Sequence, residues 1–275
     1  MEGMYENLEL ISDLNLSNYN TTNILYMINL FKNCHSLTSL NLSNFDTSKI
    51  KSIHGMFNSC INLASLDISN FKTDLVIDYS YSFQNCNSLI LLNLLNFNTL
   101  NAKYMNNMFD GCISIKSLDL SKFYTENVNN MAEMFQGCSS LENLYLSDNF
   151  NPKEVINITN MFNDCKSLKS LDLSVFNTYK ALYIDGLFAN CSSLAYLNFP
   201  EFNTYLETGF KRIFYNCASL TSLYLPYLIT IRISKYDIYL PFYGCENLTV
   251  SVKMEQCWNL PSYCPGGVSI RDLDQ

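Results

Sequence analysis

The stretches MFDGCISIKSLDLSKFYT (residues 108–125) and MFNDCKSLKSLDLSVFNT (residues 161–178) place the same residue types at the same positions, and this pattern runs through most of the 275-residue chain. Cysteine marks the pattern most clearly, because successive cysteines lie 26 residues apart except for one interval of 27 and one of 28. The series comprises Cys34, Cys60, Cys86, Cys112, Cys138, Cys165, Cys191, Cys217 and Cys245. A fixed period of this length predicts an array of stacked units.

Each repeat contains one alternating segment and one apolar stripe. Leu40-Asn41-Leu42-Ser43 alternates apolar and polar residues, which predicts a short strand with one buried side. In residues 50–60 the apolar side chains recur every three or four positions, which predicts a short helix. An aromatic residue precedes each cysteine by three positions, so we expect Phe57, Phe83 and Phe109 to lie in one contiguous file. The predicted fold class is α/β, with about ten strand–turn–short-helix coils and a parallel sheet on one face.

The repeat also predicts the domain organisation. A single coil buries too little apolar surface to fold alone, so the coils must stack on one another. Residues 1–253 are therefore expected to form one solenoid, with residues 248–253 as its last strand. The period is lost in residues 254–275, which we expect to cap the final coil.

The motif M-F-x-x-C-x-S-L-x-S-L-D-L-S-x-F-x-T, as it stands in residues 108–125 and 161–178, resembles the BspA-like leucine-rich-repeat surface proteins. The resemblance implies a right-handed leucine-rich-repeat solenoid that binds a partner and performs no catalysis. It also implies an adhesin-like protein at the cell surface or in the secreted fraction. The alternative is an intracellular, cytoplasmic scaffold or effector that uses the same repeat for protein–protein interaction.

Composition and motifs limit the other function classes. The net charge of −8 disfavours a nucleic-acid partner, and no apolar stretch is long enough for membrane insertion. We expect no metal, no cofactor and no enzymatic activity, because no catalytic or phosphate-binding motif occurs. The nine repeat cysteines are expected to be reduced core thiols, and the chain to be a monomer. Whether Cys257 and Cys264, which lie outside the period, form a disulfide stays open.

Function is expected on the strand face, where the outward-pointing residues are mostly Asn, Asp and Ser. This polar face can be read simply as a solvated surface. Exceptions to the pattern mark a candidate site for a protein or glycan ligand, because exposed tyrosine and leucine favour binding interfaces. The candidate partner-binding residues are Leu91, Leu95, Tyr145, Asp172, Tyr196, Asn198, Tyr224 and Tyr227.

Overall fold

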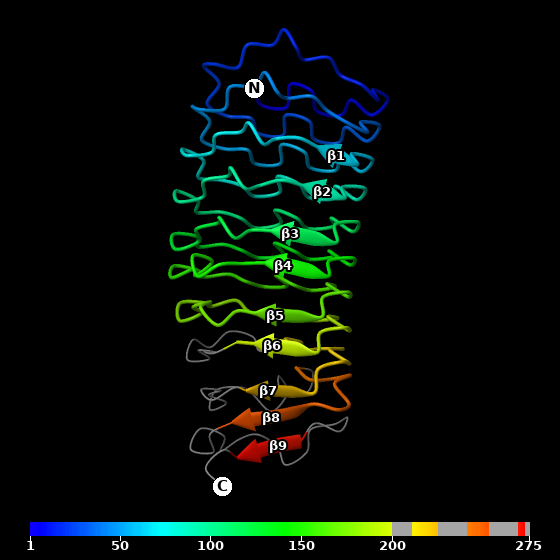
Figure 1. Ribbon diagram of the computed structural model, residues 1–275, viewed down its shortest axis with the longest axis vertical. Helices are drawn as coiled ribbons and strands as arrows, with labels where there is room; N and C mark the ends of the chain where they lie inside the picture. The colour runs from blue at the N-terminus through cyan, green and yellow to red at the C-terminus, as the bar shows by residue number, and fades with distance from the viewer. Residues whose placement is uncertain (200–210, 225–240, 253–268, 273–275) are drawn as a thin grey trace.

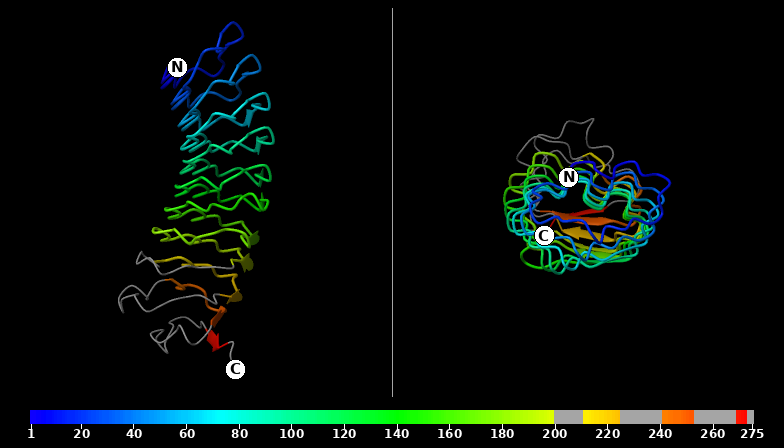
Figure 2. Two further views of the ribbon diagram at one scale, coloured as in Figure 1. Left: turned by 90° about the vertical axis from the view of Figure 1, so that its left-hand side faces the viewer. Right: turned by 90° about the horizontal axis from the view of Figure 1, so that it is seen from above.

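The computed structural model describes residues 1–199, 211–224, 241–252 and 269–272. The chain winds through coils that follow one another along the long axis of the molecule (Figure 1). Seen from the side, the coils are stacked one on another, and the strands lie on one side of the stack (Figure 2). The strands are β1 (Ser65–Leu66), β2 (Leu91–Leu92), β3 (Ser117–Asp119), β4 (Asn143–Tyr145), β5 (Ser170–Asp172), β6 (Tyr196–Asn198), β7 (Ser222–Tyr224), β8 (Thr249–Val252) and β9 (Ser269–Asp272).

All strand pairs are parallel, as the repeat predicts, and residues about one period apart lie side by side. Leu118 aligns with Leu144, for example, and Leu171 aligns with Leu197. Within the described residues, however, the strands do not form one continuous sheet. They form the pairs β1–β2, β3–β4 and β5–β6, and the group β7–β8–β9. The strand side of the stack is therefore interrupted at intervals.

The C-terminal part differs from the prediction. Residues 248–253 were expected to contain the last strand, but β9 lies further along the chain and pairs with β8. Most of the predicted capping segment, residues 254–275, lies outside the described residues, so the cap stays a prediction. Cys257 and Cys264 lie outside them as well, so whether they form a disulfide stays open.

The predicted short helices are wrong: the described residues contain no helix. In residues 53–60, every second amide N–H donates to a carbonyl of the next coil, at 2.7–3.1 Å. The amides of Met56, Asn58 and Cys60 donate to the carbonyl three residues back, at 3.0–3.1 Å, and so close a series of tight turns, while the His54 amide donates to Ser52 Oγ at 3.1 Å. We call this arrangement the turn ladder; it comprises residues 26–34 and the equivalent residues of the later coils. Parallel bridges connect it without a break from Tyr26 to Tyr183.

Left-handed residues explain why turns replace the helix. Within each coil two residues, four positions apart, have a positive φ, such as Gly55 and Ser59 with φ of 60° each. A left-handed residue ends a helix, and Gly and Asn adopt this conformation at the least cost. Asn or Gly occupies most of these positions in the other coils. The apolar stripe of residues 50–60 fits the turn ladder as well as a helix, which is why apolar spacing alone was misleading.

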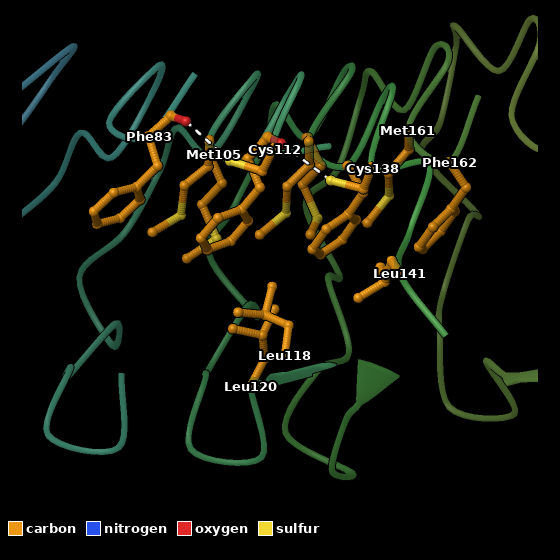
Figure 3. Packing of buried hydrophobic residues seen from close by; sticks show 14 of the residues in the cluster. Phe83, Met105, Cys112, Leu118, Leu120, Cys138, Leu141, Met161 and Phe162 are labelled. Carbon is orange, nitrogen blue, oxygen red and sulfur yellow. Dashed lines mark hydrogen bonds between the residues drawn. The ribbon is translucent and has the colours of Figure 1, made fainter. Parts of the chain in front are cut away.

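The core beneath the turn ladder contains a file of stacked aromatic rings, as predicted. It runs from Tyr5 through Phe57, Phe83 and Phe109 to Phe242, with neighbouring ring centroids 5.2–5.7 Å apart and planes within 13° of parallel. Figure 3 shows Phe83 and Phe162 from this file beside buried methionine, cysteine and leucine side chains. Every coil thus contributes one ring to a continuous column.

The nine cysteines of the repeat series are structural, and the prediction that they are buried free thiols is confirmed. Each thiol donates to the carbonyl of the stacked aromatic residue in the preceding coil, at 2.9–3.2 Å. The bond from Cys112 Sγ to the Phe83 carbonyl oxygen, 3.0 Å long, is drawn in Figure 3. Burial raises the pKa of the thiols from Cys34 to Cys191, for Cys191 to about 12, so the reactive thiolate is suppressed there.

Candidate functional site

The predicted strand-face residues lie on or beside the strands. Leu91 is 74% exposed, Tyr196 58% and Tyr145 54%. Leu95 and Tyr224 are also about half exposed, Asp172 is exposed and Asn198 is partly buried. Tyr227 lies outside the described residues. Large apolar and aromatic side chains therefore project from a face that is otherwise lined with serine, asparagine and aspartate.

The structure brings only some of these residues together. Asp172 in β5 aligns with Asn198 in β6, and Asn198 Nδ2 donates to Asp172 Oδ1 at 3.1 Å. Tyr196 lies on the same strand pair, beside Ser170. Leu91, Tyr145 and Tyr224 lie on β2, β4 and β7, which belong to other strand groups. The candidate residues thus extend along the stack and do not form one compact site.

The Asn and Asp residues of this face have a structural role. In coil after coil, a side-chain oxygen at this position accepts the amide N–H two residues later and so shapes the turn that leaves the strand. Asp172 Oδ1 accepts the amide of Ser174 at 2.8 Å. The same bond is made by Asn15, Asn41, Asp67, Asn93 and Asp119. Asp172 is therefore explained by the fold, without reference to a partner.

Tyr145 and Tyr224 occupy this position in their own coils, and the phenolic oxygen of a tyrosine lies too far from its own backbone to accept an amide two residues later. The coil of Tyr145 loses one side chain–backbone hydrogen bond, worth about 1 kcal/mol, and gains an exposed aromatic ring. In the coil of Tyr224 the residue two positions later is Pro226, which has no amide N–H to donate, so no such bond is lost there. Turn formation does not account for either tyrosine. These two positions are where the strand face departs from what folding requires.

A second surface was missed in the sequence. The lateral surface consists of residues 22–26, 48–52, 74–78, 100–104, 126–130, 153–157 and 179–183, at the start of the turn ladder in each coil. Among the described residues, nine exposed large apolar side chains lie on it, against five on the strand face. They are Leu25, Tyr26, Leu75, Ile77, Leu100, Tyr104, Ile156, Tyr179 and Tyr183. The predicted helix of residues 50–60 assigned only part of this surface, residues 50–52, to a different geometry.

Tyrosine replaces turn-forming residues on the lateral surface too. Ser52, Asp78, Asn130 and Asn157 occupy one column, and the side chain of each accepts the amide two residues later at 2.9–3.1 Å. Tyr26, Tyr104 and Tyr183 occupy the same column in the register of the turn ladder. Tyrosine at a recurring Ser, Asn or Asp position is the sequence signal that could have identified this surface.

Hollows occur on both surfaces. On the strand face, Ser39, Asn41, Ser65 and Asp67 help to line a hollow of about 380 Å³. On the lateral surface, a groove of about 360 Å³ crosses three coils. It is lined by Asn101, Lys103, Asn127, Asn129, Glu154 and Ile156. Both hollows are open to solvent and are lined mainly by polar residues, whose polar and apolar atoms contribute about equally to the surface.

The described residues offer little for metal chemistry. No group of three or more His, Cys, Asp or Glu side chains among them is arranged to hold a metal ion. His54 Nδ1 lies 3.2 Å from Asp78 Oδ2 and its ring packs against Tyr81, which makes a link between two coils. In the part of the chain that the structure describes, no helix could cross a membrane.

Two solved structures resemble the chain, although weakly. One is a crystal structure of a TLR13–ssRNA13 complex, with 18% identity over 90% of this chain and a TM-score of 0.33. The chain spans 38% of the length of that protein. The other is a leucine rich cell surface protein from Faecalibacterium prausnitzii A2-165, with 15% identity, coverage of 88% of this chain and 75% of that one, and a TM-score of 0.31. Such low scores carry no argument about function.

No curated protein matches the chain significantly. A family model does match, over residues 1–117, 67–169 and 103–225, and together these ranges include most of the chain. That family is not named BspA-like, so the resemblance to BspA-like proteins stays a prediction. The matched ranges contain the period of 26 residues, the turn ladder from Tyr26 to Tyr183 and the aromatic file as far as Phe214. The chain belongs to the family described as Mycoplasma protein of unknown function, DUF285.

Proposed function

We propose that this repeat protein binds a protein partner through its strand face and performs no catalysis. The observation that carries the proposal is the pair Tyr145 and Tyr224. Each stands where the other coils use a turn-forming side chain, and each is more than half exposed, at 54% and 53%. At Tyr145 a solvated face would keep the turn-forming residue, because that residue stabilises the fold and tyrosine does not. Tyr224 supports the proposal through its exposure alone, because Pro226 leaves no turn amide to bind there.

The neighbouring residues suit a protein contact. Leu91 and Leu95 make an exposed apolar site on and beside β2. Tyr196 lies on β6, between Tyr145 on β4 and Tyr224 on β7 along the stack. Tyrosine contributes large contact area with few rotatable bonds, and it is enriched among the residues that dominate binding energy. Asp172 and Asn198 would contribute polar contacts beside Tyr196. Tyr227 is part of the proposal on sequence grounds only.

An adhesin-like role at the cell surface is the finer form of the proposal and rests on the resemblance of the repeat to BspA-like proteins. The alternative is an intracellular scaffold. The cysteine ladder does not decide between them, because buried thiols with a raised pKa resist oxidation in either compartment. Fractionation of the cells that express the protein separates the two roles. Recovery in the cytoplasmic fraction alone would contradict the adhesin.

The strand face can be tested with three substitutions made together, Tyr145→Ser, Tyr196→Ser and Tyr224→Ser. The purified chain is first screened by biolayer interferometry against a panel of purified extracellular and cell-surface proteins. For any protein that binds, we expect the triple variant to weaken the affinity at least 30-fold, since a dominant contact residue contributes about 2 kcal/mol. The melting curve should not change, because all three side chains are exposed.

The matched control is the triple variant Tyr26→Ser, Tyr104→Ser and Tyr183→Ser on the lateral surface. It removes the same number of exposed tyrosines and should leave protein binding intact. Equal losses in the two triple variants, or no loss in the first, would contradict the assignment to the strand face.

A further inference from the structure

The lateral surface carries a groove that the proposed function does not use. The groove crosses three successive coils, which contribute Asn101 and Lys103, then Asn127 and Asn129, then Glu154 and Ile156. Its volume is about 360 Å³. Amide groups dominate the lining, and one lysine and one glutamate provide the charges. Its chemistry therefore differs from that of the tyrosine and leucine side chains on the strand face.

Exposed tyrosines stand at both ends of the groove. Tyr104 directly follows Lys103 and bridges to Asn130, whereas Tyr183 lies one coil beyond Ile156 and bridges to Asn157. Three coil spacings separate the two tyrosines, or about 14 Å along the stack. Tyr104 is 41% exposed and Tyr183 53%. Both stand at turn-forming positions, so neither is explained by the fold.

The groove is held in shape before any ligand arrives. Asn101 Nδ2 donates to the Asp74 carbonyl at 2.7 Å, and Asn127 Nδ2 donates to the Leu100 carbonyl at 3.1 Å. These bonds to the preceding coil fix both amides and leave their Oδ1 atoms as acceptors. Glu154 is held by Lys180 Nζ, which lies 2.6 Å from its Oε2. Preorganised polar groups lose little entropy on binding.

The charge of the lateral surface indicates an anionic ligand. Five lysines and four carboxylates lie on it, so its net charge is +1 on a chain whose net charge is −8. The lysines are Lys49, Lys51, Lys103, Lys153 and Lys180, and the carboxylates are Asp74, Asp78, Glu126 and Glu154. Among the described residues, no carboxylate lies within ion-pair distance of Lys103. Lys103 is thus the cation in the groove that is free to pair with a ligand.

The backbone disfavours a peptide as that ligand. An extended peptide usually pairs with the open edge of a strand. Here the amides of Lys103, Asn129 and Ile156 already donate to the preceding coil, at 2.8–3.0 Å. The groove instead offers side-chain amides, a lysine and flanking aromatic rings. A saccharide matches them with hydroxyl groups, a carboxylate and apolar ring faces.

We infer that the lateral groove binds an acidic saccharide, whose carboxylate pairs with Lys103 Nζ and whose sugar rings pack against Tyr104. Asn101 and Asn127 accept hydrogen bonds from its hydroxyl groups through Oδ1. This site is separate from the strand face and does not depend on the proposed protein partner. The triple strand-face variant should bind the saccharide as the unmodified chain does.

The experiment is calorimetric titration of the full chain with two tetrasaccharides. One alternates glucuronic acid with N-acetylglucosamine, and the other contains N-acetylglucosamine alone and lacks carboxylates. We expect the acidic tetrasaccharide to bind at least tenfold more tightly than the neutral one. Lys103→Gln should remove this difference. Tyr104→Asn should weaken both tetrasaccharides without lowering the melting temperature, because asparagine restores the turn-forming side chain used at Asn130.

Matched control variants distinguish a site from general attraction. Lys51→Gln removes a lysine from the same column two coils away, and Tyr26→Asn restores a turn-forming residue far from the groove. Both should leave binding unchanged. The inference is overturned if the acidic tetrasaccharide does not bind, if the neutral one binds equally well, or if Lys51→Gln costs as much as Lys103→Gln. A glutamate-rich peptide that competes equally well would also overturn it, because charge alone would then explain binding.

Discussion

The turn ladder and the strand side are built from the same coils but respond differently to an irregular repeat. The interval between Cys138 and Cys165 is 27 residues, and the extra residue lies between Cys138 and Phe150, on the strand side. Strand pairing is interrupted between β4 and β5, on either side of this insertion, as it also is between β2 and β3 and between β6 and β7, where the repeat is regular. The turn ladder continues across the same coils through the bridge from Asn130 to Asn157. The rings of Phe135 and Phe162 stay stacked, with centroids 5.2 Å apart.

The insertion leaves polar groups unpaired on the strand side. In regular coils a buried threonine bonds the backbone of the next coil, as Thr99 Oγ1 does with the Tyr124 carbonyl at 2.9 Å. At the insertion, Pro152 stands in place of the next threonine, and the buried Thr125 Oγ1 and Asn151 Oδ1 have no hydrogen-bond partner in the described residues. These unpaired polar atoms lie on the strand side, so the loss of hydrogen bonding is confined to that side of the stack.

The difference shows which side sets the spacing of the coils. Backbone hydrogen bonds, hydrogen bonds from the cysteine thiols and stacked rings hold the turn ladder from coil to coil. The spacing of its residues therefore tolerates little change. The strand side has short strands, breaks in pairing and exposed positions where residues can be exchanged. Residues that serve binding can therefore vary on the strand side, and at exposed turn positions of the ladder, without disturbing the core.

The largest expected effect comes from the aromatic file. Phe109→Ala should lower the free energy of unfolding by about 5 kcal/mol, because it leaves a cavity and removes two stacked contacts. Phe123→Ala on the strand side, equally buried, should cost about 3–4 kcal/mol. Urea denaturation measures both losses. Equal losses would show that ring stacking does not distinguish the two sides.

A glycine in the turn ladder tests the turns against the helix that the apolar spacing predicts. Gly137 has a φ of 69°, and an added Cβ would meet only the Gly111 backbone at 3.6 Å. Gly137→Ala should therefore destabilise the protein by about 1–2 kcal/mol through backbone strain alone. In a helix the same change would stabilise it by about 1 kcal/mol. Thermal denaturation gives the sign.

Gly111→Ala extends this test. There an added Cβ would overlap the Asn85 side chain as well as adopt a φ of 72°, so the loss should exceed that of Gly137→Ala. A gain in stability for either variant would contradict the turn ladder.

The smallest expected effect is a loss of stability in acid. Hydrogen bonds from the hydroxyl and amide of Ser121 lower the pKa of Asp119 below its ordinary value. Because the folded pKa lies below the unfolded pKa of about 3.9, this stabilisation is fully present above pH 4 and is lost as the pH falls through the folded pKa. Asn130 makes the equivalent bond in the turn ladder with a neutral side chain.

Amide hydrogen exchange can follow this loss residue by residue. Between pH 4 and pH 2.5, the protection of the Ser121 amide should fall relative to that of the Ala132 amide, which Asn130 binds. Asp119→Asn should abolish the difference. If both amides keep the same protection in acid, the carboxylate does not shape the strand-side turn.

The sequence by itself determined the period, the parallel pairing, the aromatic file and the buried thiols. Each of these follows from like residues that recur at one spacing, and a core built by stacking needs no further information. The candidate residues on the strand face could also be named, because exposed positions alternate with buried leucines such as Leu118. The structural role of Asp172 could not be predicted from the sequence, because its hydrogen bond with the Ser174 amide depends on how the chain turns.

Only the tertiary structure decided between helix and turn ladder, and with that choice it decided where the lateral surface lies. Apolar residues at 50, 53, 57 and 60 bury one side of either structure, so their spacing does not distinguish the two. The choice depends on backbone bonds to the next coil, which are long-range and leave no local pattern except Gly or Asn at left-handed positions. The groove beside Lys103 exists only because three coils, each 26 or 27 residues long, align in space.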